Sequence, residues 1–220
     1  MSVLLDIDLG ELPDEPEALY AYAHLANVAC GGHAGDHASI RRAVELSRRH
    51  GTRLGAHPSY PDRAGFGRTA MAMAWDDLAR SVREQCALLA SIAEPTHVKM
   101  HGALYHAIDR DLALASVVLG ACHEVLGTLD VLGPPNGATE STARMLGLPF
   151  LREGFADRGL RADGSLVPRG EPGALIEDTA RAADQALALA SSGRFDVLCV
   201  HGDGAHAVEI ARAVRDALDR

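Results

Sequence analysis

The chain has 220 residues and 47% of them are hydrophobic, which suits one domain with a buried core. Its formal net charge of −9 argues against nucleic acid and anionic membranes as partners. Asp6 and Asp8 interrupt the only apolar start, so no signal sequence is expected. The longest apolar run, 112–122, is shorter than the roughly 20 residues that cross a bilayer. The 4 cysteines show no CxxC spacing, which indicates neither a zinc knuckle nor a redox pair, and we expect a cytoplasmic location.

Short apolar segments bounded by turn residues are typical of buried parallel strands. They span Val3–Asp8, Leu25–Cys30, Thr52–Ala56, His97–Met100, Leu129–Leu132, Phe150–Glu153 and Phe195–Val200. Between most of them, the spacing of apolar residues predicts helices. These span His37–His50, Asp77–Ala93, Asp111–Leu126, Ala138–Leu146, Ala174–Ala190 and Ala205–Leu218. The connection from Gly10 to His24 carries Pro13 and Pro16, which argues against a full helix there.

Polar residues follow nearly every predicted strand. They are Asp8, Cys30, His33, His57, Lys99, His101, Asn136, Asp157, His201 and Asp203. Alternating strands and helices predict a parallel sheet, which is either an open doubly wound sheet or a barrel. In an open sheet only the strands near the switch point carry functional groups, whereas in a barrel all carboxyl ends converge on one mouth. We therefore predict an α/β fold, an irregular β/α barrel of about seven strands, as a single domain over residues 1–220.

The segment from Ala26 to Asp36, ANVACGGHAGD, begins as a strand, turns through glycines and leads into a helix capped by Asp36. This turn places His33 beside a helix N-terminus that can hold an anion. His57 follows the next strand in the same way, in the sequence GAHPSYPD. A single histidine in such a place is more often structural, but two at matching strand ends indicate a functional site.

Asp6 and Asp8 alternate along one strand and therefore share a face. Two carboxylates there indicate a metal site or a base with a raised pKa, and the alternative is a capping aspartate beside a solvated one. Arg68 lies in the glycine-bracketed sequence AGFGR. It either binds a carboxylate or phosphate or is a surface arginine.

Lys99 is the only lysine among the 21 basic residues. It alternates with His97 and His101 on one strand, so the three side chains share a face. A buried ammonium can shift its pKa and act as an acid or a base, which a guanidinium cannot. Two imidazoles and burial are expected to lower the pKa of Lys99. The alternative is a lysine that extends from the strand end into solvent.

A set of segments resembles the LamB/YcsF family, in the family's order over nearly the whole chain. They are DLGE at 8–11, ANVACGGHAGD at 26–36, GAHPSYPD at 55–62, GFGR at 65–68, VKMHGALY at 98–105, FADR at 155–158, LVPR at 166–169 and CVHGD at 199–203. The resemblance implies a β/α barrel related to the glycoside hydrolase/deacetylase superfamily. It also implies ATP-dependent cleavage of 5-oxo-L-proline to L-glutamate, with this chain as the LamB/YcsF component of a 5-oxoprolinase that has two further subunits.

On this hypothesis the residues assigned to catalysis are Asp8, His57, Lys99 and His101. Those assigned to substrate binding are Asn27, His33, Arg68, Asp157, Arg158, His201 and Asp203, and a divalent metal would use Asp6, Asp8, His33 and His57. No P-loop motif occurs, so ATP would bind in a nonstandard way or on a partner protein. Two alternatives stay open: a stand-alone metal-dependent hydrolase of amides or acetylated sugars, and a docking subunit without catalytic residues. Formation of a homo-oligomer also stays open.

Overall fold

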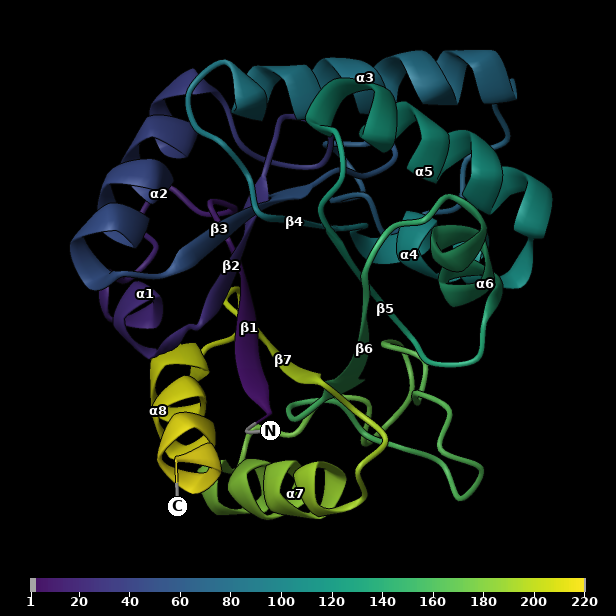
Figure 1. Ribbon diagram of the computed structural model, residues 1–220. Helices are drawn as coiled ribbons and strands as arrows, with labels where there is room; N and C mark the ends of the chain where they lie inside the picture. The colour runs from purple at the N-terminus through teal and green to yellow at the C-terminus, as the bar shows by residue number, and fades with distance from the viewer. Residues whose placement is uncertain (1–2, 220) are drawn as a thin grey trace.

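Figure 1 shows the protein as a computed structural model, which describes residues 3–219. Its seven parallel strands form a closed barrel, and the helices lie around the outside. The strands follow one another in chain order, and β7 pairs with β1 to close the barrel. The predicted β/α barrel is therefore confirmed, whereas the single-domain extent over 1–220 stays a prediction.

The strands lie close to the predicted segments. They are β1 (Leu4–Leu9), β2 (Leu25–Ala29), β3 (Arg53–His57), β4 (His97–Lys99), β5 (Asp130–Gly133), β6 (Phe150–Phe155) and β7 (Val197–His201). The helices are α1 (Ala18–Tyr22), α2 (His37–His50), α3 (Trp75–Ala90), α4 (Gly102–Arg110), α5 (Leu112–Leu126), α6 (Ala138–Met145), α7 (Thr179–Ser191) and α8 (Ala207–Leu218). Because every strand pair is parallel, all carboxyl ends lie at one end of the barrel. No helix within residues 3–219 is long and apolar enough to cross a membrane.

Helix α2 begins and ends at the residues that the sequence predicts. The side chain of Asp36 accepts hydrogen bonds from the backbone N–H groups of Ala38 and Ser39, and the Oγ of Ser39 accepts one from the backbone of Asp36. This reciprocal cap satisfies donors that the first turn of a helix otherwise leaves free. Gly51 ends the helix with a φ of +72°, which glycine adopts without strain.

Helix α3 spans Trp75–Ala90 in place of the predicted Asp77–Ala93, and two other helices differ more from the prediction. Helix α7 begins at Thr179 and not at Ala174, because the side chain of Asp178 caps it there. Helix α4 was not predicted. It follows β4 closely, its N-cap residue His101 makes no side-chain capping hydrogen bond, and it starts at Gly102 with a φ of +57°. The usual signals of a helix start are therefore missing from its sequence.

The main hydrophobic core lies between the barrel and the helices. In β1, Leu5 and Ile7 are fully buried in this core, whereas Asp6 and Asp8 point into the barrel and contact Lys99. A separate apolar cluster at inward-facing positions consists of Leu25, Leu132 and Val197. Since β2 and β7 begin with two of these residues, the polar side chains of the interior lie nearer the carboxyl ends of the strands.

Candidate active site

Lys99 lies inside the barrel at the end of β4. Its Nζ is 3.1 Å from Oδ2 of Asp6 and 2.8 Å from Oδ1 of Asp8. The same atom is 2.7 Å from Oε1 of Glu153 and donates to the Sγ of Cys199 at 3.0 Å. All five side chains are buried. Three acidic side chains and one thiol, from β1, β6 and β7, therefore surround the only lysine of the chain.

The expectation that the pKa of Lys99 is lowered is wrong. Burial acts to lower this pKa, but the charges of Asp6 and Asp8 outweigh burial and hold it well above its usual value. The rings of His97 and His101 bond to other partners and not to the ammonium. The surrounding carboxylates therefore favour the charged ammonium of Lys99 over the neutral amine.

The acidic side chains around Lys99 have pKa values shifted in opposite directions. Burial raises the pKa of Glu153 well above its usual range, and the nearby ammonium does not offset that increase. Burial acts in the same direction on Asp8, but the charges of His57 and Lys99 outweigh it and hold the pKa of Asp8 well below its usual range. Within the cluster, Asp8 is therefore shifted toward its charged form and Glu153 toward its protonated form.

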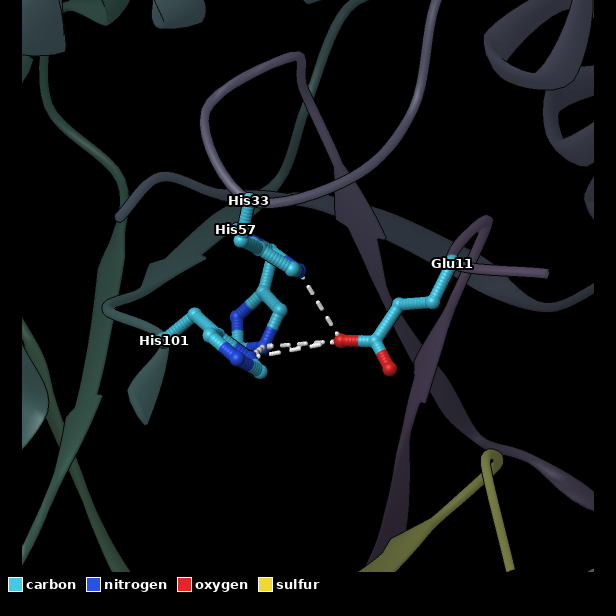
Figure 2. A group of neighbouring side chains, drawn as sticks. All are labelled: Glu11, His33, His57 and His101. Atoms are coloured by element: carbon cyan, nitrogen blue, oxygen red, sulfur yellow. Dashed lines mark hydrogen bonds and ion pairs between the residues drawn. The ribbon is translucent and has the colours of Figure 1, made fainter. Parts of the chain in front are cut away.

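Four buried side chains from the ends of β1 to β4 converge on one another (Figure 2). The Oε1 of Glu11 lies 3.0 Å from Nε2 of His33, 3.3 Å from Nδ1 of His101 and 3.9 Å from Nε2 of His57. The Nδ1 of His101 is 3.0 Å from Nε2 of His57. The Oδ2 of Asp8 is 3.4 Å from that same nitrogen of His57. The barrel therefore gathers three imidazoles and two carboxyl groups around one point.

Backbone carbonyls determine which nitrogen of two of these rings carries the proton. The Nδ1 of His57 lies 2.9 Å from the carbonyl oxygen of Lys99, and the Nε2 of His101 lies 3.0 Å from that of Phe66. A carbonyl oxygen only accepts, so both of these nitrogens donate. Burial and the charge of His57 lower the pKa of His33 to about 2 and that of His101 well below its usual value. The Nε2 of His57 and the Nδ1 of His101, which face each other, are therefore unprotonated when the rings are neutral.

A glycine in the loop after β3 packs directly on this cluster. Gly67 has a φ of +65°, and a Cβ built on it would lie 2.9 Å from the Cβ of His33 and 3.1 Å from the Cδ2 of His101. The preceding residue, Phe66, also has a positive φ of 53° and presents its carbonyl to His101. The AGFGR sequence therefore lets the backbone approach two imidazoles closely, which no residue with a side chain allows.

Asp157 and His201 form a neighbouring pair at the ends of β6 and β7. The backbone N–H of His201 donates to Oδ2 of Asp157 at 2.8 Å, and its Nδ1 lies 3.0 Å from the same oxygen. Burial raises the pKa of Asp157, but the charge and hydrogen bonds of His201 outweigh burial and lower it. Ligand atoms of His201, Asp8 and Cys199 lie within 4.8 Å of one another, so this pair adjoins the lysine cluster.

Two arginines at this end of the barrel differ in how their charges are balanced. Arg68 forms an ion pair with Asp203. Arg158 is 5% exposed and donates to the backbone carbonyls of Ala174 and Val167. Within residues 3–219, no carboxylate lies in ion-pair contact with Arg158. Arg158 therefore carries a buried positive charge that no ion pair in this part of the chain neutralises, although the charge of the neighbouring Asp157 acts on it.

The residues assigned to a metal from the sequence fall into separate groups. His33 and His57 lie with Glu11 and His101, whereas Asp6 lies at the lysine ammonium and Asp8 lies between the two groups. Asn27, assigned to substrate binding, donates its side-chain N–H groups to Asp6 at 2.7 Å and to Asp8 at 2.9 Å. It therefore orients these two carboxylates.

Sequence reasoning missed two acidic residues of the site and included one residue that lies elsewhere. Glu11 was noted only as part of DLGE, and Glu153 only as the end of a predicted strand. An acidic residue at the carboxyl end of a buried strand is the signal that could have found both. Asn136 is exposed, and its backbone N–H donates to the side chain of Glu140 in α6.

The comparisons with known proteins agree with this architecture. The model of the LamB/YcsF family matches residues 5–220. The crystal structure of a lactam utilization protein from Thermus thermophilus is 34% identical, with a TM-score of 0.90 over 100% of this chain and 96% of that chain. A glycoside hydrolase family 20 β-N-acetylglucosaminidase, 11% identical over 97% of this chain and 68% of its own, has a TM-score of 0.56 and shows the shared fold alone. Because the family match includes both side-chain clusters and nearly the whole barrel, the chain belongs to the LamB/YcsF family.

Proposed function

We propose that this chain is the LamB/YcsF component of an ATP-dependent 5-oxoprolinase, which opens the lactam ring of 5-oxo-L-proline to give L-glutamate. The family and the similar lactam utilization protein support a lactam as the substrate. The observation that carries the proposal is the meeting of Asp8 and His57 at the barrel mouth. There the Oδ2 of Asp8 and the Nε2 of His57 lie 3.4 Å apart, and a water molecule beside them can give its proton to one of these groups.

A lactam amide resists hydrolysis at neutral pH, so the reaction needs activation. Transfer of the terminal phosphoryl group of ATP to the amide oxygen makes the ring carbon electrophilic. One water molecule then adds to this carbon and gives up a proton to Asp8 or His57. The C–N bond breaks as the ring nitrogen takes a proton, and a second water molecule releases phosphate from the acyl phosphate. This sequence consumes one ATP and two water molecules for each glutamate formed.

The remaining residues of the site hold charges in place for this reaction. Lys99 keeps Asp8 ionised and fixed, which makes it a positioning residue. Arg68 and Arg158 offer guanidinium groups to the carboxylate of the lactam or to the phosphoryl group. The pair of Asp157 and His201 supplies a proton donor or acceptor near Asp8.

ATP requires a binding site, and the sequence of this chain contains no P-loop motif. We propose that ATP binds on, or together with, two further subunits and that the complex is cytoplasmic. The chain then provides the lactam-binding mouth, and its partners provide the phosphoryl donor. Although the net charge is −9, Arg68 and Arg158 both lie at this mouth, and within residues 3–219 only Arg68 of the two is paired with a carboxylate, that of Asp203, which leaves the charge of Arg158 to favour a small anionic substrate.

A second candidate function is a stand-alone metal-dependent hydrolase of amides or acetylated sugars. It is favoured by the cluster of Glu11 with three histidines, which has the ligand types of a divalent metal site. A stand-alone hydrolase needs neither ATP nor partner subunits. Activity of the isolated chain on a lactam or an N-acetyl sugar, without ATP, would favour it.

The deciding experiment is an assay of phosphate release that depends on 5-oxoproline, with and without the candidate partner subunits. We expect release only with the partners, and a loss of about 100-fold or more in Asp8→Asn. Asp130→Asn is the matched control, since Asp130 begins β5 and pairs with Arg53 at the other end of the barrel. Full activity of Asp8→Asn in the complex would instead indicate a docking subunit without catalytic residues.

A further inference from the structure

Three acceptor atoms of the cluster in Figure 2 converge on one point: the Oε1 of Glu11, the Nε2 of His57 and the Nδ1 of His101. We propose that these atoms bind one divalent transition-metal ion, with zinc as the first candidate, and that His33 is a positioning residue. The inference does not rest on the proposed function, because ion binding can be measured on this chain without substrate, ATP or partners.

The protonation of the two rings calls for a cation between them. Each ring donates its other N–H to a backbone carbonyl, so when both rings are neutral the Nε2 of His57 and the Nδ1 of His101 both present lone pairs, only 3.0 Å apart. Two buried acceptors facing each other are unfavourable unless a proton or a metal ion lies between them. Ligating histidines in proteins usually donate their other N–H to a carbonyl or carboxylate, as both rings do here.

The distances between the acceptor atoms suit a single ion. Ligand atoms bound at about 2.0–2.2 Å to a tetrahedral zinc ion lie roughly 3.3–3.6 Å from one another. The three separations are 3.0 Å between His57 and His101, 3.3 Å between Glu11 and His101, and 3.9 Å between Glu11 and His57. Shifts of a few tenths of an ångström, roughly, would therefore bring all three atoms to ligand positions.

Ring geometry separates the ligands from the positioning residue. The rings of His57 and His101 are nearly perpendicular, at 86°, so both ring planes can contain the same ion. The ring of His33 instead stacks on that of His101, with centroids 3.6 Å apart and an angle of 5° between the planes. An ion in the plane of the His101 ring lies outside the plane of the His33 ring. His33 therefore donates from Nε2 to Glu11, at 3.0 Å, and orients that carboxylate.

The neighbouring acidic group is excluded as the ion site because it already holds a cation. Lys99 places its ammonium 3.1 Å from Asp6, 2.7 Å from Glu153 and 3.0 Å from Cys199. Asp8 joins the two sites, since its Oδ1 faces the ammonium at 2.8 Å and its Oδ2 faces His57 at 3.4 Å. One buried carboxylate thus balances charge on both sides, which lowers the cost of placing an ion next to Lys99.

Three protein ligands leave a fourth position open, which is the arrangement of catalytic rather than structural zinc sites. A mixed set of imidazole and carboxylate ligands suits zinc, cobalt, nickel or iron better than magnesium or calcium. Zinc in such a site lowers the pKa of a bound water molecule to about 7. With an ion on Nε2 and the Nδ1–H on the carbonyl of Lys99, His57 would have no nitrogen free to act as a base, so the proton of the attacking water would pass to Asp8, whose Oδ2 lies 3.4 Å from that Nε2.

The first test measures the ion on the isolated chain. The protein is stripped with a chelator and titrated with Zn²⁺ against a chromophoric competitor, and with Co²⁺ by visible absorption. We expect one equivalent of Zn²⁺ with a Kd at or below about 1 μM, equivalent to roughly −8 kcal/mol. The Co²⁺ complex should show the intense bands of a four- or five-coordinate ion. Failure of the wild-type chain to bind a stoichiometric ion would overturn the proposal and leave a shared proton as the occupant.

The second test uses variants to separate ligands from the positioning residue. His101→Gln and Glu11→Gln should lose stoichiometric binding, whereas His33→Gln should keep one equivalent with a Kd raised about 10–100-fold. His123→Gln is the control, because His123 lies in α5 and bonds to the carbonyl of Gly127. Equal losses in His33→Gln and His101→Gln would contradict the ligand assignment. If a variant does not fold by circular dichroism, the wild-type stoichiometry and cobalt spectrum still decide the proposal.

Discussion

The Nζ of Lys99 lies 2.8 Å from the Oδ1 of Asp8 inside the closed barrel. This ion pair explains why a chain that otherwise uses arginine keeps one lysine. A compact ammonium can contact Asp6, Asp8 and Glu153 at once, whereas a planar guanidinium is wider and presents a fixed set of donors. Together with His57, the lysine therefore favours the charged form of this carboxylate, and it holds the carboxylate in position facing His57.

Replacing Lys99 should destabilise the fold as well as the reaction. Lys99→Met leaves Asp6 and Asp8 as buried carboxylates without a cation, which should lower the free energy of unfolding by about 3–5 kcal/mol. Urea unfolding measures this change. Arg80→Met is the control, since Arg80 pairs with Asp77 on the exposed face of α3 and should matter by less than about 1 kcal/mol. Similar losses in the two variants would show that the ammonium does not balance buried charge.

Lys99→Arg keeps the positive charge but replaces the compact ammonium with a planar guanidinium. It therefore tests whether the site needs the shape of the cation as well as its charge. We expect it to fold and to lose most turnover in the assembled complex, because a guanidinium would displace Asp8. Asp8 is the acid–base group that this change would displace, and the loss of such a positioned group typically costs about 10²–10⁴ in rate. Steady-state phosphate release with 5-oxoproline measures the loss, with circular dichroism as the folding control. Near-normal turnover would mean that Lys99 supplies positive charge alone.

Glu153 should make the fold less stable as the pH rises. Its pKa is raised well above the usual 4.5 by burial, so above about that pH the folded state holds a proton that the unfolded state has released. The free energy of unfolding then falls with pH, by up to about 1.4 kcal/mol per unit, until the raised pKa is reached. Glu153→Gln removes this proton exchange, so the stability of the variant relative to the wild type should increase with pH.

Urea unfolding between about pH 5 and pH 8 measures the slope that Glu153 contributes. The matched control is Glu171→Gln, because Glu171 is exposed and pairs with Arg161 on the surface. We expect the control to follow the wild type at every pH. If the free energy of unfolding of Glu153→Gln changes with pH in the same way as that of the wild type, then Glu153 releases its proton as easily in the folded protein as in the unfolded chain. The raised pKa of Glu153 is then wrong.

Most of the fold follows from local patterns in the sequence. Each strand is a short apolar run that ends at a polar or turn residue, and α2 carries both of its end signals, Asp36 and Gly51. Helix α4 could not be predicted, since it starts at a glycine with positive φ and without a capping side chain. Its start depends on packing, because a Cβ on Gly102 would lie 2.5 Å from the carbonyl oxygen of Gly67.

The site could be predicted only in part. The position of His57 and His101 after strands identified them as candidates, because all carboxyl ends of a parallel barrel meet. The partners of each side chain depend on contacts across the barrel, which no local pattern contains. Lys99 shows this most clearly: its strand neighbours are histidines, but its contacts are carboxyl groups from β1 and β6. Its pKa was therefore predicted in the wrong direction.

Arg158 should bind the carboxylate that distinguishes 5-oxoproline from a plain lactam. Its buried guanidinium donates to two backbone carbonyl oxygens and forms no ion pair within residues 3–219, so an anionic substrate gains a charge-assisted hydrogen bond there. Arg158→Met should raise KM for 5-oxoproline about 10–100-fold, as expected for the loss of such a bond. Arg161→Met is the control, because Arg161 is exposed in the same loop and pairs with Glu171. It should leave KM unchanged.

The carboxylate-free analogue 2-pyrrolidinone tests the chemical reason for the effect of Arg158. Turnover of this analogue by the wild-type complex should already be poor, and Arg158→Met should not reduce it much further. A double comparison of two substrates and two enzymes then isolates the interaction between guanidinium and carboxylate. If Arg158→Met weakens both substrates equally, the arginine supports the loop and does not contact the substrate.

A methyl group on Gly67 should disturb the imidazoles without touching their chemistry. Gly67 and Gly193 have nearly equal φ angles of 65° and 66°, so alanine should cost each position a similar backbone strain of about 1–2 kcal/mol. A Cβ on Gly193 meets nothing within 4 Å, whereas one on Gly67 would lie 2.9 Å from the Cβ of His33. Overpacking typically costs a further 1–3 kcal/mol or so, and it should move His33 and His101 off their present positions.

The difference between Gly67→Ala and Gly193→Ala therefore isolates the contact with the histidines. Urea unfolding should show a larger loss of stability for Gly67→Ala, and the assembled complex should lose turnover only with that variant. The Kd for Co²⁺ should rise in Gly67→Ala as well, because the carbonyl of Phe66, which fixes the protonation of His101, moves with the loop. Equal stability, turnover and Co²⁺ affinity in the two variants would show that the loop does not position the imidazoles.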